Sequence, residues 1–362
     1  MQQTSKWVGL DVHARQSRVA VLDQRSGELW GRRFGLPPVE LTSFLAALGP
    51  GLRAVYEAGP TGFGLARAAA ECGLDVRVCA PGSIPRAPGE RVKTDRRDAE
   101  RLARLLAAGQ LSFVRVPSRE EEQLRDLVRA REDVRVDLMR ARHRLGKFLL
   151  RRDLRYPGPH GAWTERHLSW LARLRFADPA SRATFADYLA AVEALLERRS
   201  ALERALAELL PASPWADTVA RLRCLRGVET LTAAGLLAEL GDFGRFARPA
   251  LLSGFLGLVP REATSGERRR QGSITKAGSS HARRLLVEAA HHYRLPPRIS
   301  PALRRRQAGQ DPRVCALAWR AQQRLYARWR QLAGERRKPA PVVAVACARE
   351  LASFCWEAAT LE

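Results

Sequence analysis

The amino-acid sequence predicts an α/β domain, a pair of long helices and a mainly α-helical C-terminal region. Up to about residue 117, short apolar runs with β-branched residues alternate with helix-like segments. Two stretches with heptad spacing follow between residues 118 and 212. Residues 213–335 contain helix-like segments separated by glycine turns, and a last helix is expected over residues 336–362.

The first domain is expected to have the strand order of an RNase H-like fold. Its predicted strands cover residues 6–12, 17–23, 29–34, 52–57 and 75–80, and its predicted helices cover residues 40–48, 62–72 and a segment from about 95. Turn signals separate these segments, at Asp23, Ser26-Gly27, Gly35 and the Pro81-Gly82 loop with Pro85 and Pro88. Three strands followed by alternating helices and strands is the order of RNase H-like sheets.

Four acidic residues stand where such a fold would bring them together. Asp11 and Glu57 each close a strand-like run, and Asp95 and Asp98 lie one helical turn apart. Carboxylates at the rim of a sheet repel one another unless a divalent cation neutralises them, and Mg²⁺ and Mn²⁺ prefer oxygen ligands. The pattern predicts a metal site for phosphoryl transfer on nucleic acid. Alternatively, Asp95 and Asp98 are first-turn acids favoured by the helix dipole.

The middle of the chain is predicted to form two long helices with apolar stripes. Ser118 and Glu121 form a capping-box pattern, and the first helix is expected to reach about Arg152. The two stripes consist of Leu124, Leu127, Arg131, Val134, Leu138, Ala141, Leu145 and Phe148, and of Val192, Leu195, Arg199, Leu202, Leu206 and Leu209. Their spacing is typical of a coiled coil that pairs within one chain or between chains. We expect a structural role for both stripes, with Arg131 and Arg199 as polar residues that set the register.

The C-terminal region combines a turn motif with a high density of arginine. Residues 225–228, Leu-Arg-Gly-Val, and a helix over 231–240 resemble a helix-hairpin-helix, whose glycine turn presents N–H groups to phosphate. A polar loop over residues 264–270 and a basic helix over 281–293 follow. Nine arginines and one acid lie between residues 298 and 330, with three aromatic residues among them. That stretch suits a surface that follows a nucleic-acid backbone, or else a solvated helical face.

The composition indicates a polyanionic partner. The chain has 62 Lys and Arg against 38 Asp and Glu, which gives a net charge of +24 and a pI near 11.2. Its six cysteines show no C-x-x-C pairing, so neither a zinc site nor a disulfide framework is expected. The sequence shows no signal peptide and no long uninterrupted apolar segment, so we expect a cytoplasmic protein without a membrane span.

Seven short motifs occur in an order that resembles one known family. They are Gly9-Leu10-Asp11-Val12-His13, Glu57-Ala58-Gly59-Pro60-Thr61-Gly62, Lys93-Thr94-Asp95 with Asp98-Ala99, Gly257-Leu258 with Pro260, Ser265-Gly266, Ile274-Thr275-Lys276 with Gly278, and Arg283-Arg284-Leu285-Leu286. Together they resemble the insertion-sequence one-ten family, the DEDD transposases, also described as bridge-RNA-guided recombinases. Each motif alone is weak, but the ordered set is specific and spans about residues 5–295.

The resemblance implies a RuvC-like domain over residues 1–117, a coiled-coil insertion over 118–212 and a transposase domain over 213–335. The family's acidic tetrad falls on Asp11, Glu57, Asp95 and Asp98, and its nucleophilic serine falls on Ser265. The expected cofactor is Mg²⁺, with Mn²⁺ as the other candidate. Expected partners are donor and target DNA, a structured guide RNA and further copies of the chain, in a homodimer or homotetramer with composite sites.

The sequence departs from the family pattern at two places. Residues 57–62 read Glu-Ala-Gly-Pro-Thr-Gly where the family often has Glu-Ala-Thr-Gly, a change that does not move Glu57. Residues 226–228 read Arg-Gly-Val where a Pro-Gly-Ile/Val-Gly turn is common, which weakens the helix-hairpin-helix interpretation.

Six basic residues flank the proposed nucleophile and are the predicted phosphate contacts: Arg268, Arg269, Arg270, Lys276, Arg283 and Arg284. By composition alone Ser265 is an ordinary turn residue, and His13 beside Asp11 is a satisfied surface histidine. Two other functions stay open at this point. One is a metal-dependent, structure-selective nuclease in which water attacks, and the other is a non-catalytic nucleic-acid-binding protein.

Overall fold

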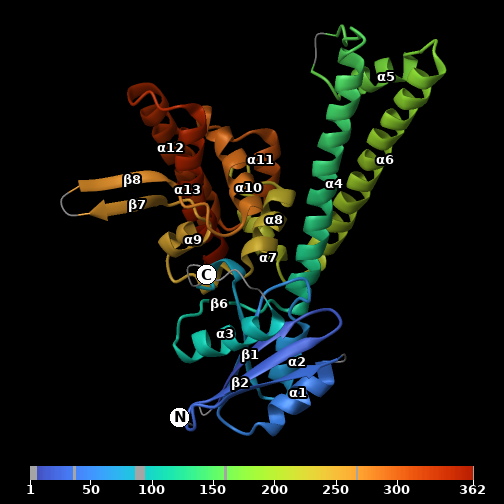
Figure 1. The fold of residues 1–362 in the computed structure, drawn as a ribbon. Helices are drawn as coiled ribbons and strands as arrows, with labels where there is room; N and C mark the ends of the chain where they lie inside the picture. The colour runs from blue at the N-terminus through green and yellow to red at the C-terminus, as the bar shows by residue number, and fades with distance from the viewer. Residues whose placement is uncertain (1–5, 36–37, 86–93, 159–160, 266–267, 362) are drawn as a thin grey trace. The chain divides into compact units, whose positions relative to one another are not determined.

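The computed structural model describes residues 6–35, 38–85, 94–158, 161–265 and 268–361, without the side chains of residues 38–39 and 263–271 (Figure 1). The chain divides into two compact units, Met1–Ser118 and Arg119–Glu362. Among the described residues, no helix combines the length and the apolar character that a membrane crossing requires.

The N-terminal unit contains a six-stranded mixed sheet with the order β3-β2-β1-β4-β5-β6. The strands are β1 (Lys6–Val12), β2 (Ser17–Asp23), β3 (Leu29–Phe34), β4 (Leu52–Glu57), β5 (Asp75–Cys79) and β6 (Phe113–Val114). Strand β1 pairs antiparallel with β2 and parallel with β4, so β1 and β4 run the same way at the centre of the sheet. The five predicted strands are confirmed to within one residue, whereas β6 is too short to show a periodic pattern.

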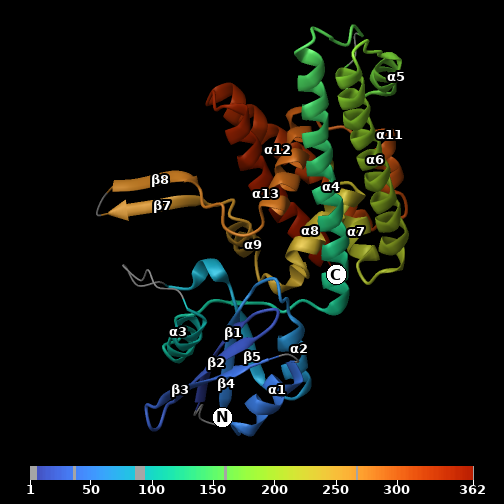
Figure 2. The same cartoon turned by 45° about the vertical axis from the view of Figure 1, so that its right-hand side comes forward.

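Helices cover both faces of this sheet (Figure 2). They are α1 (Pro38–Ala47), α2 (Gly64–Glu71), a short 3₁₀ turn η1 (Pro81–Ser83) and α3 (Asp95–Ala107). Because side chains alternate along a strand, Leu10 packs in one core with α1 and α2, while Val55 packs in another with Leu102 of α3. The mixed sheet with helices on both faces is consistent with the predicted RNase H-like fold.

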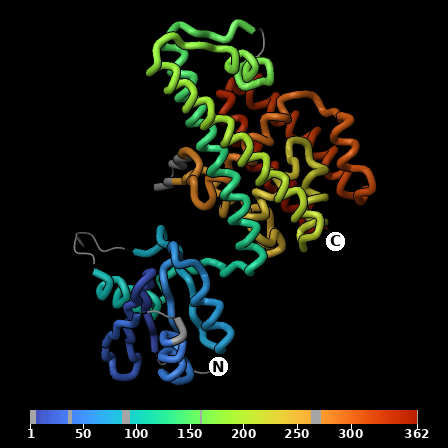
Figure 3. The backbone as a smooth tube through the Cα atoms, turned by 90° about the vertical axis from the view of Figure 1, so that its right-hand side faces the viewer, coloured from blue at the N-terminus to red at the C-terminus, as the bar shows by residue number. Residues whose placement is uncertain are grey.

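The second unit begins with a long antiparallel helical hairpin (Figure 3). It consists of α4 (Arg119–Leu150), α5 (Glu165–Arg173) and α6 (Pro179–Leu209). The predicted stripes meet within one chain, where Leu145 and Phe148 of α4 pack in one core with Val192 of α6. Arg131 bridges the two long helices through a 2.6 Å ion pair with Glu203. The coiled-coil description itself stays a prediction.

The remainder of the second unit is a helical bundle around the C-terminal helix. Its helices are η2 (Leu210–Ala212), α7 (Ala216–Leu222), α8 (Thr230–Leu240), η3 (Phe243–Arg245), α9 (Pro249–Phe255), α10 (Ser280–Ala290), η4 (His291–Arg294), α11 (Pro301–Gln307), α12 (Pro312–Arg330), the π-helical η5 (Gln331–Glu335) and α13 (Ala340–Thr360). Val343, Cys347, Leu351 and Cys355 are each at most 1% exposed. This four-residue spacing buries one stripe of α13 in the core that α10 and α12 share.

A two-stranded ribbon replaces the polar loop predicted over residues 264–270. Strand β7 (Pro260–Ser265) pairs antiparallel with β8 (Arg268–Ile274), and Ser265 is the register partner of Arg268. The prediction was wrong about the secondary structure because residues 261–273 carry no alternating apolar pattern, which is the sequence signal for a strand with a buried face.

Candidate metal centre and basic surface

Two neighbouring parallel strands, β1 and β4, place Asp11 and Glu57 at their carboxyl-terminal ends, on the same side of the sheet's central pair. Leu10 of β1 is the register partner of Tyr56 of β4, and the two acidic residues come next along each strand. By alternation, Asp11 lies on the same face as Gly9, and Glu57 lies on the same face as Val55. Gly9 and Val55 belong to the face of the sheet that packs against α3. The two carboxylates therefore lie on the α3 side of the sheet.

Because Gly9 has no side chain, helix α3 can approach strand β1 closely. A Cβ atom on Gly9 would lie 2.0 Å from the carbonyl oxygen of Ala99 and 2.5 Å from the nitrogen of Ala103. The helix begins at Asp95 because the Thr94 side chain accepts a 3.3 Å hydrogen bond from the Arg97 N–H. The first turn of α3 carries both Asp95 and Asp98.

His13 joins the acidic cluster, although the sequence analysis left it outside the site. Its Nε2 atom lies 3.1 Å from Asp11 Oδ2 and 3.8 Å from Asp95 Oδ1. One ligand atom from each of Asp11, His13 and Asp95 lies within 4.8 Å of the other two. Gln16 donates a 3.2 Å hydrogen bond to the other oxygen of Asp95 and orients that carboxylate.

A signal for His13 is present in the sequence. The residue stands two positions after Asp11 in Asp11-Val12-His13, at the end of a strand. Side chains two apart on a strand lie on the same face, so His13 is expected beside Asp11 whenever the strand geometry continues for one residue.

Glu57 and Asp98 lie at the margin of this cluster. Glu57 lines a cavity of about 860 Å³ together with Asp11 and His13. Asp98 forms a 2.7 Å ion pair with Arg101, one turn further along α3, and its side chain is 14% exposed. The predicted tetrad is thus divided between two carboxylates that touch His13 and two that lie around them.

The electrostatics of Asp11 show an incompletely neutralised anionic site. Burial raises the pKa of Asp11, and the charges of Asp95 and Asp98 raise it further, against the opposing effect of His13. Ionisation of Asp11 is therefore less favourable in the folded protein than in an exposed aspartate. A cation bound within the cluster would offset the repulsion of Asp11 by Asp95 and Asp98, and would thereby favour the ionised form of Asp11.

The donor set fits a divalent cation. Two carboxylates and one imidazole offer oxygen and nitrogen ligands, which suit Mg²⁺ and Mn²⁺, and the imidazole favours the softer Mn²⁺ more than an all-oxygen site would. Asp11, His13 and Asp95 would hold the ion directly. Glu57 faces the same cavity and is available as a further ligand.

The proposed nucleophile and three predicted phosphate contacts lie on the ribbon of the second unit. Ser265 ends β7, and Arg268, Arg269 and Arg270 belong to the first half of β8. Their side chains are outside the described part of the structure, as is the whole of Gly266, so the structure leaves these predictions as they stand.

Lys276 and Arg283 belong to a tight backbone crossing beside α10. Lys276 has a left-handed φ of 58°, and its N–H donates to the Gly257 carbonyl at 3.1 Å. The Arg283 guanidinium donates to the carbonyls of Leu256, Ala277 and Gly278. Arg283 thus holds this loop in place, a structural task that the sequence analysis did not foresee.

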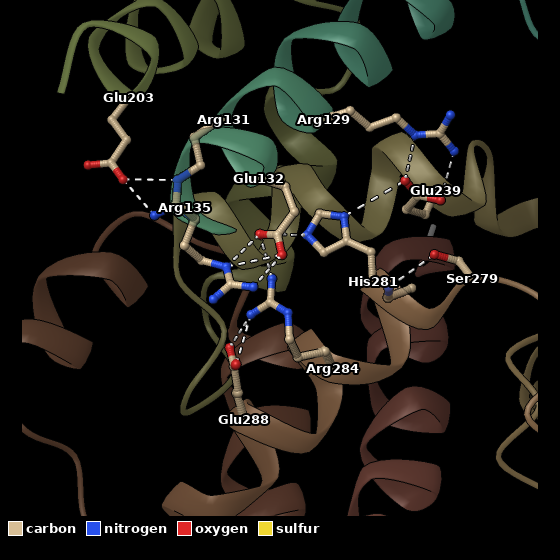
Figure 4. A network of polar contacts seen from close by, with 11 residues as sticks. Arg129, Arg131, Glu132, Arg135, Glu203, Glu239, Ser279, His281, Arg284 and Glu288 are labelled. Atoms are coloured by element: carbon tan, nitrogen blue, oxygen red, sulfur yellow. Dashed lines mark hydrogen bonds and ion pairs between the residues drawn. The ribbon is translucent and has the colours of Figure 1, made fainter. Parts of the chain in front are cut away.

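Arg284 is engaged in an ion-pair network between α4, α8 and α10 (Figure 4). It contacts Glu132 of α4 at 2.8 Å and Glu288 of its own helix at 2.8 Å. His281 stands between Glu132 and Glu239, 3.7 and 3.8 Å away. Since two carboxylates neutralise Arg284, its charge is less available to phosphate than the sequence alone suggests.

The fold and the arrangement of the carboxylates together indicate a class of protein. A mixed sheet of this order, with carboxylates at the ends of its central parallel strands, is consistent with the RNase H-like nucleic-acid enzymes. Comparison with known families gives two matches: a DEDD transposase model of the IS110 type over residues 8–152, and the Transposase IS116/IS110/IS902 family over residues 219–305.

Relatives match over nearly the whole chain. A Sinorhizobium fredii protein named as transposase y4qE is 40% identical, over 97% of this chain and 87% of its own length. The transposase for insertion sequence element IS1533 of Leptospira borgpetersenii is 34% identical, over 92% of this chain and 98% of its own length. The chain therefore belongs to the IS110/IS116 family of transposases, enzymes that cut and rejoin DNA, and the family resemblance of its motifs is confirmed.

Proposed function

We propose that this transposase cuts and rejoins the DNA strands of an insertion sequence by metal-assisted attack of Ser265 on a phosphodiester. The observation that carries the proposal is the convergence of Asp11, His13 and Asp95 at the end of β1 in a chain of this family. Glu57 and Asp98 complete the acidic set, the former from the cavity wall and the latter from the first turn of α3.

The metal, Mg²⁺ or Mn²⁺, would supply charge neutralisation for the transferring phosphoryl group and its leaving oxygen. The protein's part is to fix the ligands in advance. The Thr94 cap fixes the start of α3, Gly9 sets the distance of α3 from the sheet, and Gln16 orients Asp95. His13 and Asp11 share one strand end, which holds nitrogen and oxygen donors at a fixed separation.

The serine step conserves the phosphodiester bond energy. The Ser265 hydroxyl loses its proton and its oxygen bonds to phosphorus, while the bond from phosphorus to the 3′ oxygen of the strand breaks and that oxygen leaves. The phosphoserine diester can then be attacked by another 3′ hydroxyl, which releases serine and reseals a strand without ATP. This chemistry separates recombination from hydrolysis by water.

The net charge of +24 supports binding of the chain to large polyanionic partners. We infer DNA as substrate and a structured guide RNA as partner, so that base pairing selects the sites while the protein contacts the backbone. Ser265 and the acidic cluster belong to different compact units of the chain. A homodimer or homotetramer would allow one chain to supply the serine and another the metal site.

Sequencing of donor–target junctions tests the proposal. Cells would express the chain with its flanking noncoding DNA, as wild type, Asp11→Ala or Ser265→Ala. Loss of precise junctions with both substitutions is the expected result. If Ser265→Ala still forms junctions or cuts DNA, water or another hydroxyl attacks and the metal-dependent nuclease is the better description. If Asp11→Ala retains full function, a non-catalytic binding role replaces both.

A further inference from the structure

A second cavity, of about 500 Å³, lies in the helical bundle of the second unit. It forms where the turn between α7 and α8 meets the segment from η4 to α11; α7, α8 and α11 are labelled in Figure 1. Its polar lining consists of Arg226, Glu229, His292, Arg298, Ser300 and Arg306. The cavity is thus rich in guanidinium groups that come from separate parts of the chain.

Gly227 brings the first of these arginines into place. It has a φ of 80°, and a Cβ atom there would lie 2.6 Å from the carbonyl oxygen of Ala289 in α10. The turn therefore packs directly on α10, which places Arg226 against the segment after η4. Arg226 donates to the carbonyl of Pro296 at 2.8 Å, so its guanidinium is held in a fixed position.

Arg306 lines the cavity from helix α11. It donates to the Val228 carbonyl at 3.1 Å and pairs with Glu229 at 3.2 Å, and its side chain is 13% exposed. Its Nε atom is buried and finds no hydrogen-bond partner among the described residues. The Val228 and Glu229 contacts hold the Arg306 side chain in the cavity lining.

Arg298 is the uncommitted member of the group. Its backbone N–H donates to the Gln322 side chain at 3.0 Å, which fixes the chain at this point. Within the described part of the chain, no hydrogen bond or ion pair engages its guanidinium. The side chain is thus free to close on a ligand.

The charge around the cavity is unbalanced. Among the described residues of its lining, three are arginines and one, Glu229, is a carboxylate whose side chain is 74% exposed. Burial lowers the pKa of Arg226 and of Arg306, and the charge of Arg298 lowers that of Arg226 further. Burial and the charges of Arg226 and Arg294 also lower the pKa of His292, against the opposing effect of Glu229. Binding of an anion would relieve the repulsion.

We infer that this cavity binds a phosphate group of a nucleic-acid strand through Arg226, Arg298 and Arg306. Guanidinium groups match phosphate oxygens with paired N–H donors, and the three arginines line one cavity from separate segments of the chain. The inference rests on the proposed function, in that the chain acts on nucleic acid. It differs from a helix-hairpin-helix contact because side chains, not the N–H groups of the glycine turn, supply the donors.

Binding of single-stranded DNA in a chelator, with no metal present, tests this site apart from catalysis. The full-length protein is titrated with one oligonucleotide that carries hydroxyl ends and with the same oligonucleotide carrying a 5′-phosphate, at several salt concentrations. Arg298→Gln is the main variant, and Arg306→Gln is the second. Arg305→Gln is the matched control, because it removes the same charge from α11 at a position that does not line the cavity.

The expected result is a weakening of about 3- to 10-fold and a salt slope lower by about one for Arg298→Gln, with no comparable change for Arg305→Gln. An equal effect on both oligonucleotides identifies a backbone phosphate, whereas an effect confined to the 5′-phosphorylated one identifies a strand-terminal phosphate. Displacement by millimolar inorganic phosphate in wild type but not in Arg298→Gln supports the same site.

Equal losses for Arg298→Gln and Arg305→Gln would show a general charge effect and overturn the inference, as would unchanged binding by Arg298→Gln. Thermal unfolding checks that Arg306→Gln is folded. These outcomes are independent of junction formation, so the phosphate site can fail while the transposase mechanism stands. Conversely, the mechanism fails if Asp11→Ala forms junctions, whatever the binding result.

Discussion

His13 and Asp11 lie together at the end of strand β1, with His13 Nε2 3.1 Å from Asp11 Oδ2. Asp95 reaches the same point from the first turn of α3, 3.8 Å from His13. The imidazole therefore stands between two carboxylates that come from distant parts of the sequence. In the metal-free protein it acts as their partner, and with metal bound it would become a ligand beside them.

Replacing His13 with alanine should weaken metal binding by roughly 10- to 100-fold, because the site loses its nitrogen donor while both carboxylates remain. The measurement is the rise in unfolding temperature of the full chain across a Mn²⁺ titration, since a ligand that binds the folded state stabilises it. His143→Ala, at an exposed position on α4, controls for non-specific binding of metal to histidine. Identical titration curves for wild type and His13→Ala would exclude His13 as a ligand.

Asp11→Asn should separate stability from metal binding. Without metal, the variant should unfold at a slightly higher temperature than wild type, because the amide removes the charge that burial, Asp95 and Asp98 disfavour. With saturating Mn²⁺ the order should reverse, since the variant loses a charged ligand. A variant that is less stable than wild type in chelator would show that the Asp11 carboxylate is stabilising by itself.

The sequence predicts the strands, and the strand ends at which Asp11 and Glu57 stand, because each follows from a local pattern. Five strands show short apolar runs between turn signals, and Asp11 and Glu57 stand at two strand ends. Other features depend on tertiary contacts. Strand β6 owes its existence to pairing with β5, and Arg283 finds its carbonyl partners across a loop crossing. Nothing in the local sequence encodes such partners.

His13 shows how a site residue is missed for a physical reason. A histidine after an aspartate is common on protein surfaces, and its side chain is indeed 52% exposed. His13 differs from such a surface residue because Asp95 also lies close to it, and this proximity requires α3 to pack against Gly9. That approach is a contact between residues far apart in the sequence, so no local sequence pattern predicts the distance between them.

Gly9→Ala should destabilise the N-terminal unit by about 1–3 kcal/mol and weaken metal binding as well. The added Cβ would meet backbone atoms of Ala99 and Ala103, which can move only with helix α3, and overpacking has costs of this size. Chemical denaturation and the Mn²⁺ titration give the two readouts. Gly146→Ala is the matched control: this position in α4 has open space around it, and alanine should stabilise the helix by up to about 1 kcal/mol. If both variants behave alike, the close approach at Gly9 is not required.

Glu239 provides a pH-dependent contribution to the stability of the second unit. Burial alone would raise the pKa of its carboxyl, but the contacts with His281 and Arg129, the charge of Arg129 and a hydrogen bond from Ser279 outweigh it and lower the pKa to about 2. Figure 4 shows the contacts with His281 and Arg129. The Glu239 side chain is 8% exposed and that of His281 is 16% exposed, so solvent screens their contact less than the contact with Arg129, whose side chain is 56% exposed. The folded-state pKa thus lies below the ordinary value of 4.5, which applies to the unfolded chain.

A group with a lowered folded-state pKa stabilises the protein above its unfolded pKa, and this stabilisation is lost as the pH falls. For Glu239 the window runs from about pH 4.5 down to about 2, and the stabilisation lost within it is about 3 kcal/mol. Urea denaturation at a series of pH values should show that Glu239→Gln is less stable than wild type at pH 7, with a smaller loss towards pH 2. Glu193→Gln, at an exposed position on α6, should follow the wild-type curve. Parallel curves for wild type and Glu239→Gln would mean that the carboxylate titrates alike in the folded and unfolded states, and that its contacts with Arg129 and His281 contribute no net stability.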